Sequence, residues 1–349
     1  MLGWSAYTAG KEMPMKRIRR ALVWALFFII VTTGCSDEVQ TYHFTRFAMD
    51  TVVDYTLVSS DRSTAREAML DAHEEVKRIE HLFWEEDSSS EIYRFNISDS
   101  GITTTAEIYE LIKRARRYYT LTNGLFDITI KPVLSLYSFG DENAEPPEPV
   151  AISSRLQLVG MEHVKLSESD DEASPYLLRK TDSGVKLALG GLAKGYAVDR
   201  AVGILEDRGI DQGLINAGGD LYCLGARGDV PWKIGIQDPE DPNSIAAVLQ
   251  CRDRAVATSG DYQRFFIHEG ERYHHLLDPG TGRPARTVRS ATVLTTSTER
   301  ADALATGLFI KGIPGGFAMV DSLGDTYGIV VDSTGRLHFS DGARKFLAE

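Results

Sequence analysis

The spacing of apolar positions along the chain predicts several amphipathic helices. Within 64–83, apolar residues recur at intervals of three and four, which places them on one helical face: Ala65, Met69, Ala72, Val76, Ile79 and Phe83. A second helix is predicted at 106–121, with Asn123-Gly124 after its end, and helical spacing returns at 299–312. Each of these helices is expected to pack one face against a core.

Apolar runs rich in β-branched and aromatic residues predict the strands. These runs lie at 125–140, where Pro132 interrupts the pattern, and at 185–189, 232–237, 255–259, 264–268, 273–277 and 290–296. The segments 141–149 and 167–175 are rich in proline and acidic residues and are typical of surface loops. Because helices and strands are partly segregated and partly alternating, the pattern favours an α+β fold with a mixed or mostly antiparallel sheet over a doubly wound α/β fold.

The first 34 residues differ from the rest of the chain. A basic stretch at 16–20 precedes eleven apolar residues at 21–31, too few for a comfortable membrane span but suited to a secretory signal. The segment that follows, ending at Cys35, resembles the lipobox of bacterial lipoproteins. We therefore predict a signal peptide at 1–34, lipidation at Cys35 and one compact catalytic unit at 35–349. The alternative is an uncleaved signal anchor, and Met15 is an alternative start to Met1.

Charge and cysteine content limit the possible partners. The formal net charge is −12, and removal of the basic leader makes the remainder more acidic, so nucleic acid is not expected as a partner. An acidic protein that binds a phosphate ligand needs glycine amides, a lysine or a bridging cation at the site. Beyond Cys35 only Cys223 and Cys251 remain, which excludes a disulfide framework and a thiolate metal cluster but leaves open whether the two form a disulfide or stay free.

Three short segments carry candidate chemistry. In 189–200, a glycine pair precedes a predicted helix with Lys194 in its first turn, an arrangement that can bind phosphate or can be a simple tight turn. Asp302 and Thr306 lie four residues apart on one helical face, where their oxygens could bind Mg²⁺ or hydrogen-bond to each other. If 273–277 is a regular strand, His274 and His275 must point to opposite faces, so that only one of them can face a site.

Seven motifs in this order resemble the ApbE family, the FAD:protein FMN transferases. They are FAMDT (47–51), FDIT with Pro132 (126–129), LGGLAKGYAVD (189–199), NAGGD (216–220), TSGDY (258–262), HHLLDPGTGRPA (274–285) and ADALATGLF (301–309). The resemblance covers roughly 45–312. It implies an α+β fold of the ApbE type, with mixed or antiparallel sheets and packed helices.

The same resemblance implies a set of site residues. FAD contacts would come from Met49, Leu125, Phe126, Asp127, Lys194 and the main chain near Leu276. Mg²⁺ would be bound by Asp302, Thr306 and the main-chain carbonyl of Gly191, and His275 would be the histidine needed for transfer. Two positions depart from the family pattern: Ala188 stands where aspartate is usual, and Glu86 stands near a usual tyrosine, so that Trp84 or Tyr93 would have to stack on the adenine.

The implied reaction is Mg²⁺-dependent transfer of FMN from FAD to a serine or threonine hydroxyl of a target protein, with release of AMP. The expected acceptors are periplasmic subunits of membrane redox complexes, and the expected location is the bacterial cell envelope, lipid-anchored and facing the periplasm. Two alternatives stay open: an FAD pyrophosphatase that gives FMN and AMP, and a non-catalytic periplasmic flavin-binding lipoprotein.

Overall fold

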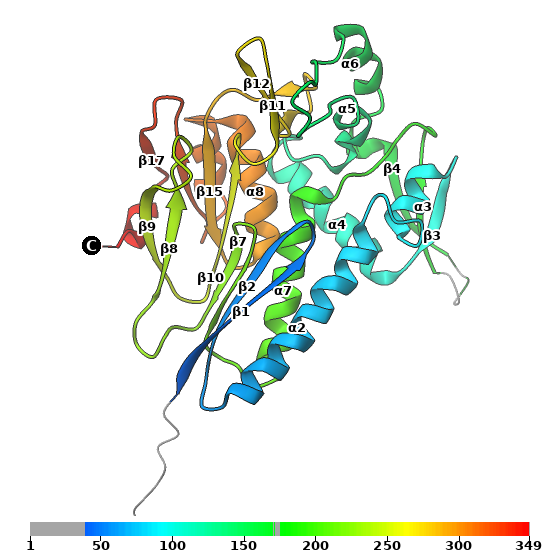
Figure 1. Ribbon diagram of the computed structural model, residues 1–349. Helices are drawn as coiled ribbons and strands as arrows, with labels where there is room; N and C mark the ends of the chain where they lie inside the picture. The colour runs from blue at the N-terminus through cyan, green and yellow to red at the C-terminus, as the bar shows by residue number, and fades with distance from the viewer. Residues whose placement is uncertain (1–38, 170, 172–174, 349) are drawn as a thin grey trace, which may run out of the picture. The chain divides into compact units, whose positions relative to one another are not determined.

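The computed structural model describes residues 39–169, 171 and 175–348, and those from 41 onward belong to one compact unit. The central element is an eight-stranded sheet in the order β1-β2-β6-β7-β10-β15-β16-β17 (Figure 1). Its strands are β1 (Gln40–Ala48), β2 (Thr51–Ser59), β6 (Gly213–Ala217), β7 (Asp220–Leu224), β10 (Arg254–Gly260), β15 (Ser290–Thr295), β16 (Tyr327–Val331) and β17 (Leu337–Phe339). The neighbours from β2 to β17 all pair antiparallel, which confirms the predicted fold class.

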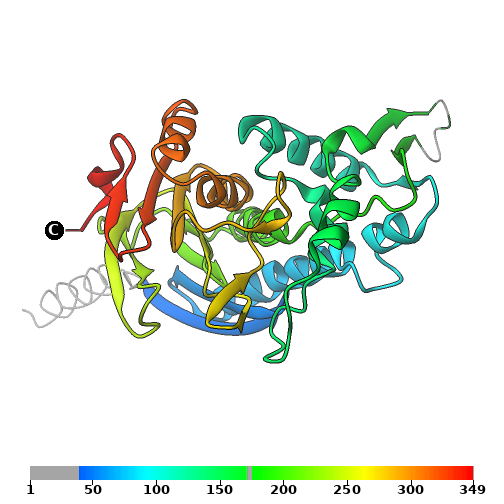
Figure 2. The ribbon, with the colours of Figure 1, turned by 90° about the horizontal axis from the view of Figure 1, so that it is seen from above.

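Three long helices cover one face of this sheet (Figure 2). They are α2 (Arg62–Phe83), α7 (Gly190–Asp207) and α8 (Thr298–Lys311). One hydrophobic cluster joins α2 and α7 to β2 and β6, and a second joins α8 to β10 and β15. Asp61 caps α2 by accepting a hydrogen bond from the Thr64 amide at 2.7 Å. All six apolar residues predicted for the buried face of α2 are buried, which confirms the helix predicted from their spacing.

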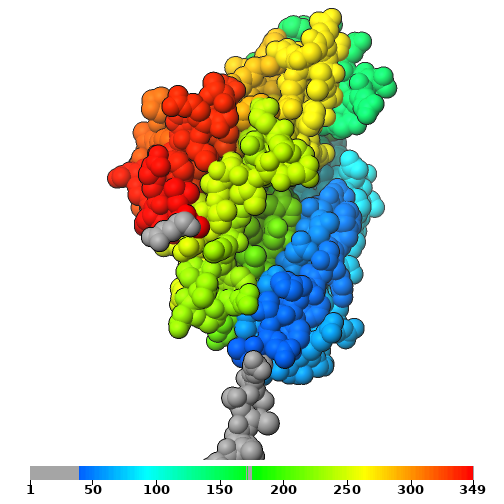
Figure 3. Space-filling model, turned by 60° about the vertical axis from the view of Figure 1, so that its left-hand side comes forward, coloured from blue at the N-terminus to red at the C-terminus, as the bar shows by residue number. Residues whose placement is uncertain are grey.

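The other face of the sheet is covered by the hairpin of β8 (Trp232–Gln237) and β9 (Ile245–Cys251). Side chains from this hairpin pack with those of β7, β10 and β15 in a separate cluster, which includes the buried Cys223 and Cys251. Both thiols are free in the structure. The hairpin lies beside the C-terminal segment, where the Ala348 amide donates to the Val248 carbonyl at 2.9 Å (Figure 3).

A smaller group of elements extends from the helical face. It contains α3 (Glu91–Ile97), α4 (Ala106–Leu121) and an antiparallel sheet in the order β3-β5-β4, formed by β3 (Gly101–Thr104), β4 (Val164–Glu168) and β5 (Tyr176–Lys180). The remaining elements are α5 (Lys131–Leu134), α6 (Pro149–Leu156), α9 (Gly315–Asp321), the short 3-10 helices Ile128–Ile130, Met161–His163 and Ala343–Phe346, and the hairpins β11 (Phe265–His268) with β12 (Glu271–His274) and β13 (Leu277–Asp278) with β14 (Arg283–Pro284).

Two predicted strands are absent from the described structure. The segment 125–140 forms a 3-10 helix and α5 instead of a strand, because Asp127 caps the first turn by accepting from the Thr129 amide at 2.8 Å and Pro132 lies in the first turn of α5. The segment 185–189 joins no sheet, since the amides of Leu187 and Ala188 donate to the Asn96 side chain and to the Ile128 carbonyl. The glycine pair that follows it is therefore not a turn but the start of α7.

Other predictions concern the ends of the chain and the loops. The predicted signal peptide 1–34 and Cys35 lie outside the described residues. Among the residues that the structure describes, no helix is both long and apolar enough to cross a membrane. In the predicted surface loop 167–175, Ser167 and Glu168 end β4, and residues 170 and 172–174 are not described. The predicted loop 141–149 is irregular up to Pro149, where α6 begins.

Candidate active site

The first turn of α7 lies against the last half of α8. A Cβ added at Gly191 would lie 3.7 Å from the Thr306 hydroxyl oxygen and 3.2 Å from the Phe126 ring. Three predicted site residues from distant parts of the sequence therefore meet at this point. The close approach of the Phe126 ring also explains why a residue without a side chain suits position 191.

The crossing of α7 and α8 is made possible by Gly195. A Cβ at this position would lie 2.4 Å from the Thr298 carbonyl oxygen, so the two helix backbones are in direct contact there. The Gly195 amide lies 3.3 Å from Oδ2 of Asp302 and donates to it. In a regular helix the same amide faces the carbonyl of residue 191. The Gly191 carbonyl and the Asp302 carboxylate therefore face the same amide.

Lys194 lies between two buried carboxylates. Its Nζ is 2.5 Å from Oδ2 of Asp220 and 3.7 Å from Oδ2 of Asp302. Burial raises the pKa of Asp302 to about 7, an effect that the charge of Asp220 strengthens, and burial also raises the pKa of Asp220. Burial acts to lower the pKa of Lys194, but the two carboxylates outweigh it and hold this pKa above its usual value.

Asp220 was not among the site residues predicted from the sequence. It is the first residue of β7 and follows the turn at Gly218 and Gly219, which have φ values of 62° and 101°. The motif NAGGD was recognised in the sequence, but nothing local to it indicated which residue its carboxylate would contact. The pairing of β7 with β10 and the packing of α7 bring Asp220 to Lys194.

The Thr306 hydroxyl does not bond to the Asp302 carboxylate. It lies 3.4 Å from the main-chain carbonyl of Asp302 and 3.4 Å from the hydroxyl of Ser259 at the end of β10. A hydrogen bond between the two side chains, which was the alternative to a metal site, is therefore not what the structure contains. The Asp302 carboxylate instead faces Lys194 and the Gly195 amide.

The donor set at this point fits Mg²⁺. The carboxylate of Asp302, the hydroxyl of Thr306 and the carbonyl of Gly191 are all oxygen donors, and Mg²⁺ commonly keeps several waters beside one carboxylate. Over 39–169, 171 and 175–348 no group of three or more His, Cys, Asp and Glu side chains could hold a metal ion. A cation at this site would thus depend on hydroxyl, carbonyl and water ligands as well as on Asp302.

The two histidines lie in different surroundings, although 273–277 is not one regular strand. Strand β12 ends at His274, and β13 begins at Leu277, because the Leu277 amide turns back to the His275 carbonyl at 3.0 Å. The His274 side chain is buried, with Nε2 2.7 Å from the Ala285 carbonyl oxygen and its ring edge-on to Phe309. The prediction of a regular strand was wrong, but the different orientation of the two side chains is observed.

His275 is partly exposed beyond the end of β12. Its main-chain amide donates to the Arg264 carbonyl at 3.1 Å, which fixes the backbone of this residue against the start of β11. Desolvation lowers the pKa of His275 to about 4, and the charge of Lys194 contributes in the same direction. The imidazole is therefore neutral at pH 7 and lies within electrostatic reach of Lys194.

The remaining predicted FAD contacts lie in three separate connecting segments. Met49 lies in the turn between β1 and β2 with φ 55°, and its amide lies 2.5 Å from Oε1 of Glu80 in α2. Leu125 is half-buried, and Phe126 and Leu276 are buried. Burial raises the pKa of Asp127 to about 6, while its carboxylate caps the 3-10 helix after it.

The positions that depart from the family pattern lie mostly at the surface. Ala188 is half-buried directly before α7, and Glu86 is exposed after α2. Of the two candidates for an adenine stack, Trp84 is 45% exposed and Tyr93 is half-buried. Trp84 therefore has the more accessible ring.

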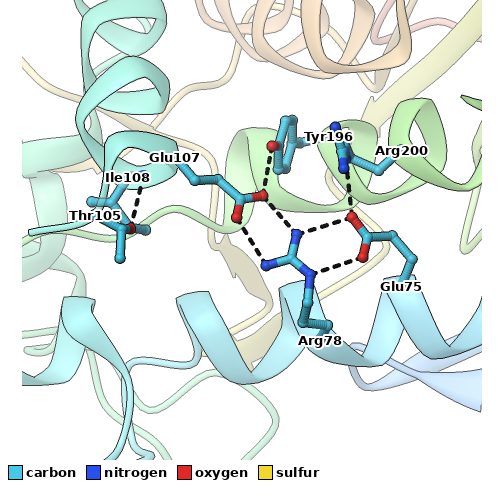
Figure 4. A network of polar contacts seen from close by, with 7 residues as sticks. All are labelled: Glu75, Arg78, Thr105, Glu107, Ile108, Tyr196 and Arg200. Atoms are coloured by element: carbon cyan, nitrogen blue, oxygen red, sulfur yellow. Dashed lines mark hydrogen bonds and ion pairs between the residues drawn. The ribbon is translucent and has the colours of Figure 1, made fainter.

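A network of ion pairs links α7, which carries Lys194, to α2 and α4 (Figure 4). The guanidinium of Arg78 in α2 makes bidentate hydrogen bonds to two carboxylates. Those to Glu75 measure 2.8 and 2.9 Å, and both of those to Glu107 of α4 measure 2.8 Å. Tyr196 and Arg200 of α7 reach Glu107 and Glu75 at 2.7 and 3.0 Å. The helix with Lys194 is thereby tied to α2 and α4.

Comparison with known proteins agrees with this geometry. The family model described as "ApbE family" matches residues 49–330. The FAD:protein FMN transferase of Vibrio cholerae is 31% identical over 310 residues, covering 85% of this chain and 90% of that protein, and that of Treponema pallidum is 32% identical over 238 residues, covering 65% and 66%.

Solved structures show the same relationship. The crystal structure of the ApbE protein from Thermotoga maritima superposes with a TM-score of 0.80 at 33% identity and covers 89% of this chain and 100% of that one. The flavin transferase ApbE from Vibrio cholerae gives a TM-score of 0.74 at 30% identity over 88% of this chain and 100% of that one. The chain belongs to the ApbE family.

Proposed function

We propose that this protein is an FAD:protein FMN transferase that moves FMN from FAD to a serine or threonine hydroxyl of another protein in a Mg²⁺-dependent reaction. The acceptor oxygen forms a bond to the FMN-side phosphorus of FAD, the bond from this phosphorus to the bridging oxygen breaks, and AMP leaves with that oxygen. The observation that carries the proposal is the meeting of Lys194, Asp302 and Thr306 at the crossing of α7 and α8. The names of the relatives support the same reaction.

The cation site is proposed at Asp302, Thr306 and the Gly191 carbonyl. When bound there, Mg²⁺ would offset negative charge on the pyrophosphate and on the departing AMP oxygen. Lys194 supplies a further positive charge, and an ammonium has three donors, so contact with Asp220 leaves it able to bind a phosphate oxygen. The helix N-terminus at Gly190 and Gly191 favours an anion in the same place.

His275 is proposed to take the proton of the acceptor hydroxyl. Its pKa of about 4 leaves the imidazole unprotonated at pH 7, which is the form that can accept a proton. Its side chain is partly exposed, so the hydroxyl of another protein can reach it. His274 cannot share this role, because it is buried against Phe309 and the Ala285 carbonyl.

FAD is proposed to contact Met49, Leu125, Phe126, Asp127 and the main chain at Leu276 in addition to Lys194. The acceptors are proposed to be periplasmic subunits of membrane redox complexes, with the enzyme held at the cell envelope by a lipid on Cys35. Support for the anchor comes from the sequence of 16–35 alone.

The test is incubation of the purified protein with FAD and Mg²⁺, with and without an acceptor protein, followed by separation of AMP, FMN and flavin-labelled acceptor. The proposal predicts equal amounts of AMP and labelled acceptor, and little AMP when the acceptor or Mg²⁺ is left out. Release of FMN and AMP at the same rate without acceptor would identify a pyrophosphatase. Tight FAD binding without any AMP would identify a flavin-binding protein.

A further inference from the structure

The carboxylate of Asp220 has a single charged partner within the described structure. Its side chain is 5% exposed, and Oδ2 has no hydrogen-bond partner apart from the ion pair with Lys194 at 2.5 Å. The Thr258 amide of β10 acts to lower the pKa of Asp220, but burial of the carboxylate outweighs this effect. Asp220 is therefore a buried carboxylate whose charged partner is the longer and more exposed side chain of Lys194.

Lys194 has a second carboxylate nearby. Asp302 lies 3.7 Å from Nζ, further than Asp220, and receives the Gly195 amide at 3.3 Å. The lysine ammonium is a compact charge at the end of a flexible chain of four carbons. Small torsional changes can therefore move it between the carboxylates of Asp220 and Asp302. If the closer carboxylate were absent, Asp302 would be the nearest negative charge to Lys194.

We propose that Asp220 is a positioning residue that draws the ammonium of Lys194 closer to itself than to Asp302, which weakens the competition between this ammonium and a divalent cation for the Asp302 carboxylate. The inference rests on the proposed metal role of Asp302. A cation and an ammonium that compete for one carboxylate weaken each other's binding, and such coupling typically changes affinity by about 5- to 150-fold. Asp220 weakens this competition by giving Lys194 a closer partner, 2.5 Å away instead of 3.7 Å.

The experiment measures Mg²⁺ binding by the FAD-free and FAD-loaded protein with calorimetry, together with crystal structures of the metal-free variants. In Asp220→Asn we expect the Mg²⁺ affinity to fall by about tenfold. We also expect Nζ of Lys194 to move to within about 3 Å of an Asp302 oxygen. In the double variant Asp220→Asn with Lys194→Met, the competing ammonium is gone and the Mg²⁺ affinity should return to near the wild-type value.

A matched control separates the position of Lys194 from a general loss of negative charge. Asp50→Asn removes the same charge at the β1–β2 turn, next to Thr51, whose hydroxyl lies close to Gly218 in the turn before Asp220. Asparagine readily adopts the left-handed conformation found at this position, where φ is 55°. This control should leave the Mg²⁺ affinity within about twofold of wild type. That change is much smaller than the roughly tenfold fall expected for Asp220→Asn.

Several results would overturn the inference. It fails if Asp220→Asn binds Mg²⁺ as tightly as wild type, if the double variant does not recover, or if the affinity of Asp220→Asn falls while Lys194 keeps its position in the crystal. A wild-type protein without Mg²⁺ affinity also overturns it. Because binding is measured directly, a protein that shows the predicted pattern but transfers no FMN would support the inference and contradict the proposed function.

Discussion

The carboxylate of Asp199 in α7 accepts a hydrogen bond from the amide of Thr298, the first residue of α8, at 2.6 Å, and another from Glu299 at 3.0 Å. A side chain of one site helix thus caps the other, since the first amides of a helix have no partner within it. Asp199 lies on the same helix as Lys194, and Asp302 follows Thr298 by about one turn. The relative position of Lys194 and Asp302 therefore depends on this cap.

Loss of the cap should destabilise the fold. Asp199→Ala leaves two amides at the start of α8 without this acceptor and should lower the free energy of unfolding by about 1–2 kcal/mol. Asp199→Asn keeps one acceptor oxygen and should lose less. Urea unfolding of the wild type and the two variants ranks their stabilities. An alanine variant as stable as wild type would show that α8 needs no cap besides Ser297, whose hydroxyl accepts a hydrogen bond from the Arg300 amide.

The helix crossing makes opposite predictions for two glycines of α7. Gly195→Ala places a Cβ 2.4 Å from the Thr298 carbonyl oxygen and should cost about 1–3 kcal/mol of unfolding free energy, because the backbones must separate. Gly203→Ala has no atom within 4 Å of the new Cβ and should stabilise the helix by about 0.5–1 kcal/mol. Thermal and urea unfolding provide the comparison. Equal effects at both positions would contradict the close crossing.

Asp302→Ala tests the proposed cation site. It removes the only carboxylate of the donor set and should abolish Mg²⁺-dependent AMP release, while the protein still binds FAD through its other contacts. AMP release followed at increasing Mg²⁺ gives the result. Turnover that remains at the wild-type level would show that the metal, if used, binds elsewhere.

The low pKa of His275 predicts the pH profile of transfer. Because the proposed base is protonated only below about pH 4, the transfer rate at saturating FAD and Mg²⁺ should be flat from pH 6 to 8 and fall as the pH drops towards 4. An unperturbed histidine would instead lose activity near pH 6.5. Initial rates in buffers of constant ionic strength distinguish the two, and a midpoint near 6.5 would mean that desolvation of His275 is lost in the working enzyme.

Local patterns predicted the long helices well because their apolar spacing is a property of each segment alone. The helix at 64–83 and the one at 299–312 match α2 and α8 within two residues. The prediction of a strand at 125–140 is wrong. Its β-branched residues favour a strand, but Asp127 and Pro132 start helical turns there. The local pattern could not show which residues meet across the fold.

Site residues illustrate the same limit. Asp302 and Thr306 stood out because they share a helical face, and Lys194 because it follows two glycines. Asp220 follows a glycine turn, as many surface acidic residues do, and only the packing of α7 against β7 shows that it is the partner of Lys194. The sequence left Cys223 and Cys251 undecided, and in the structure both are free and buried.

We expect His275 to take part in FMN transfer and His274 to stabilise the fold. His274→Ala removes a buried ring that contacts Phe309 and the Ala285 carbonyl, so it should lower the thermal midpoint but leave the rate per folded molecule nearly unchanged. His275→Ala removes a partly exposed ring, so the thermal midpoint and the FAD affinity should change little.

The most direct measurement is the rate of FMN transfer from FAD to an acceptor protein by these two variants, each normalised to its folded, FAD-binding fraction. The account predicts a loss of about two to four orders of magnitude for His275→Ala, the usual contribution of a positioned general base, and a rate close to wild type for His274→Ala. A His275→Ala enzyme that transfers FMN at the wild-type rate would contradict the account.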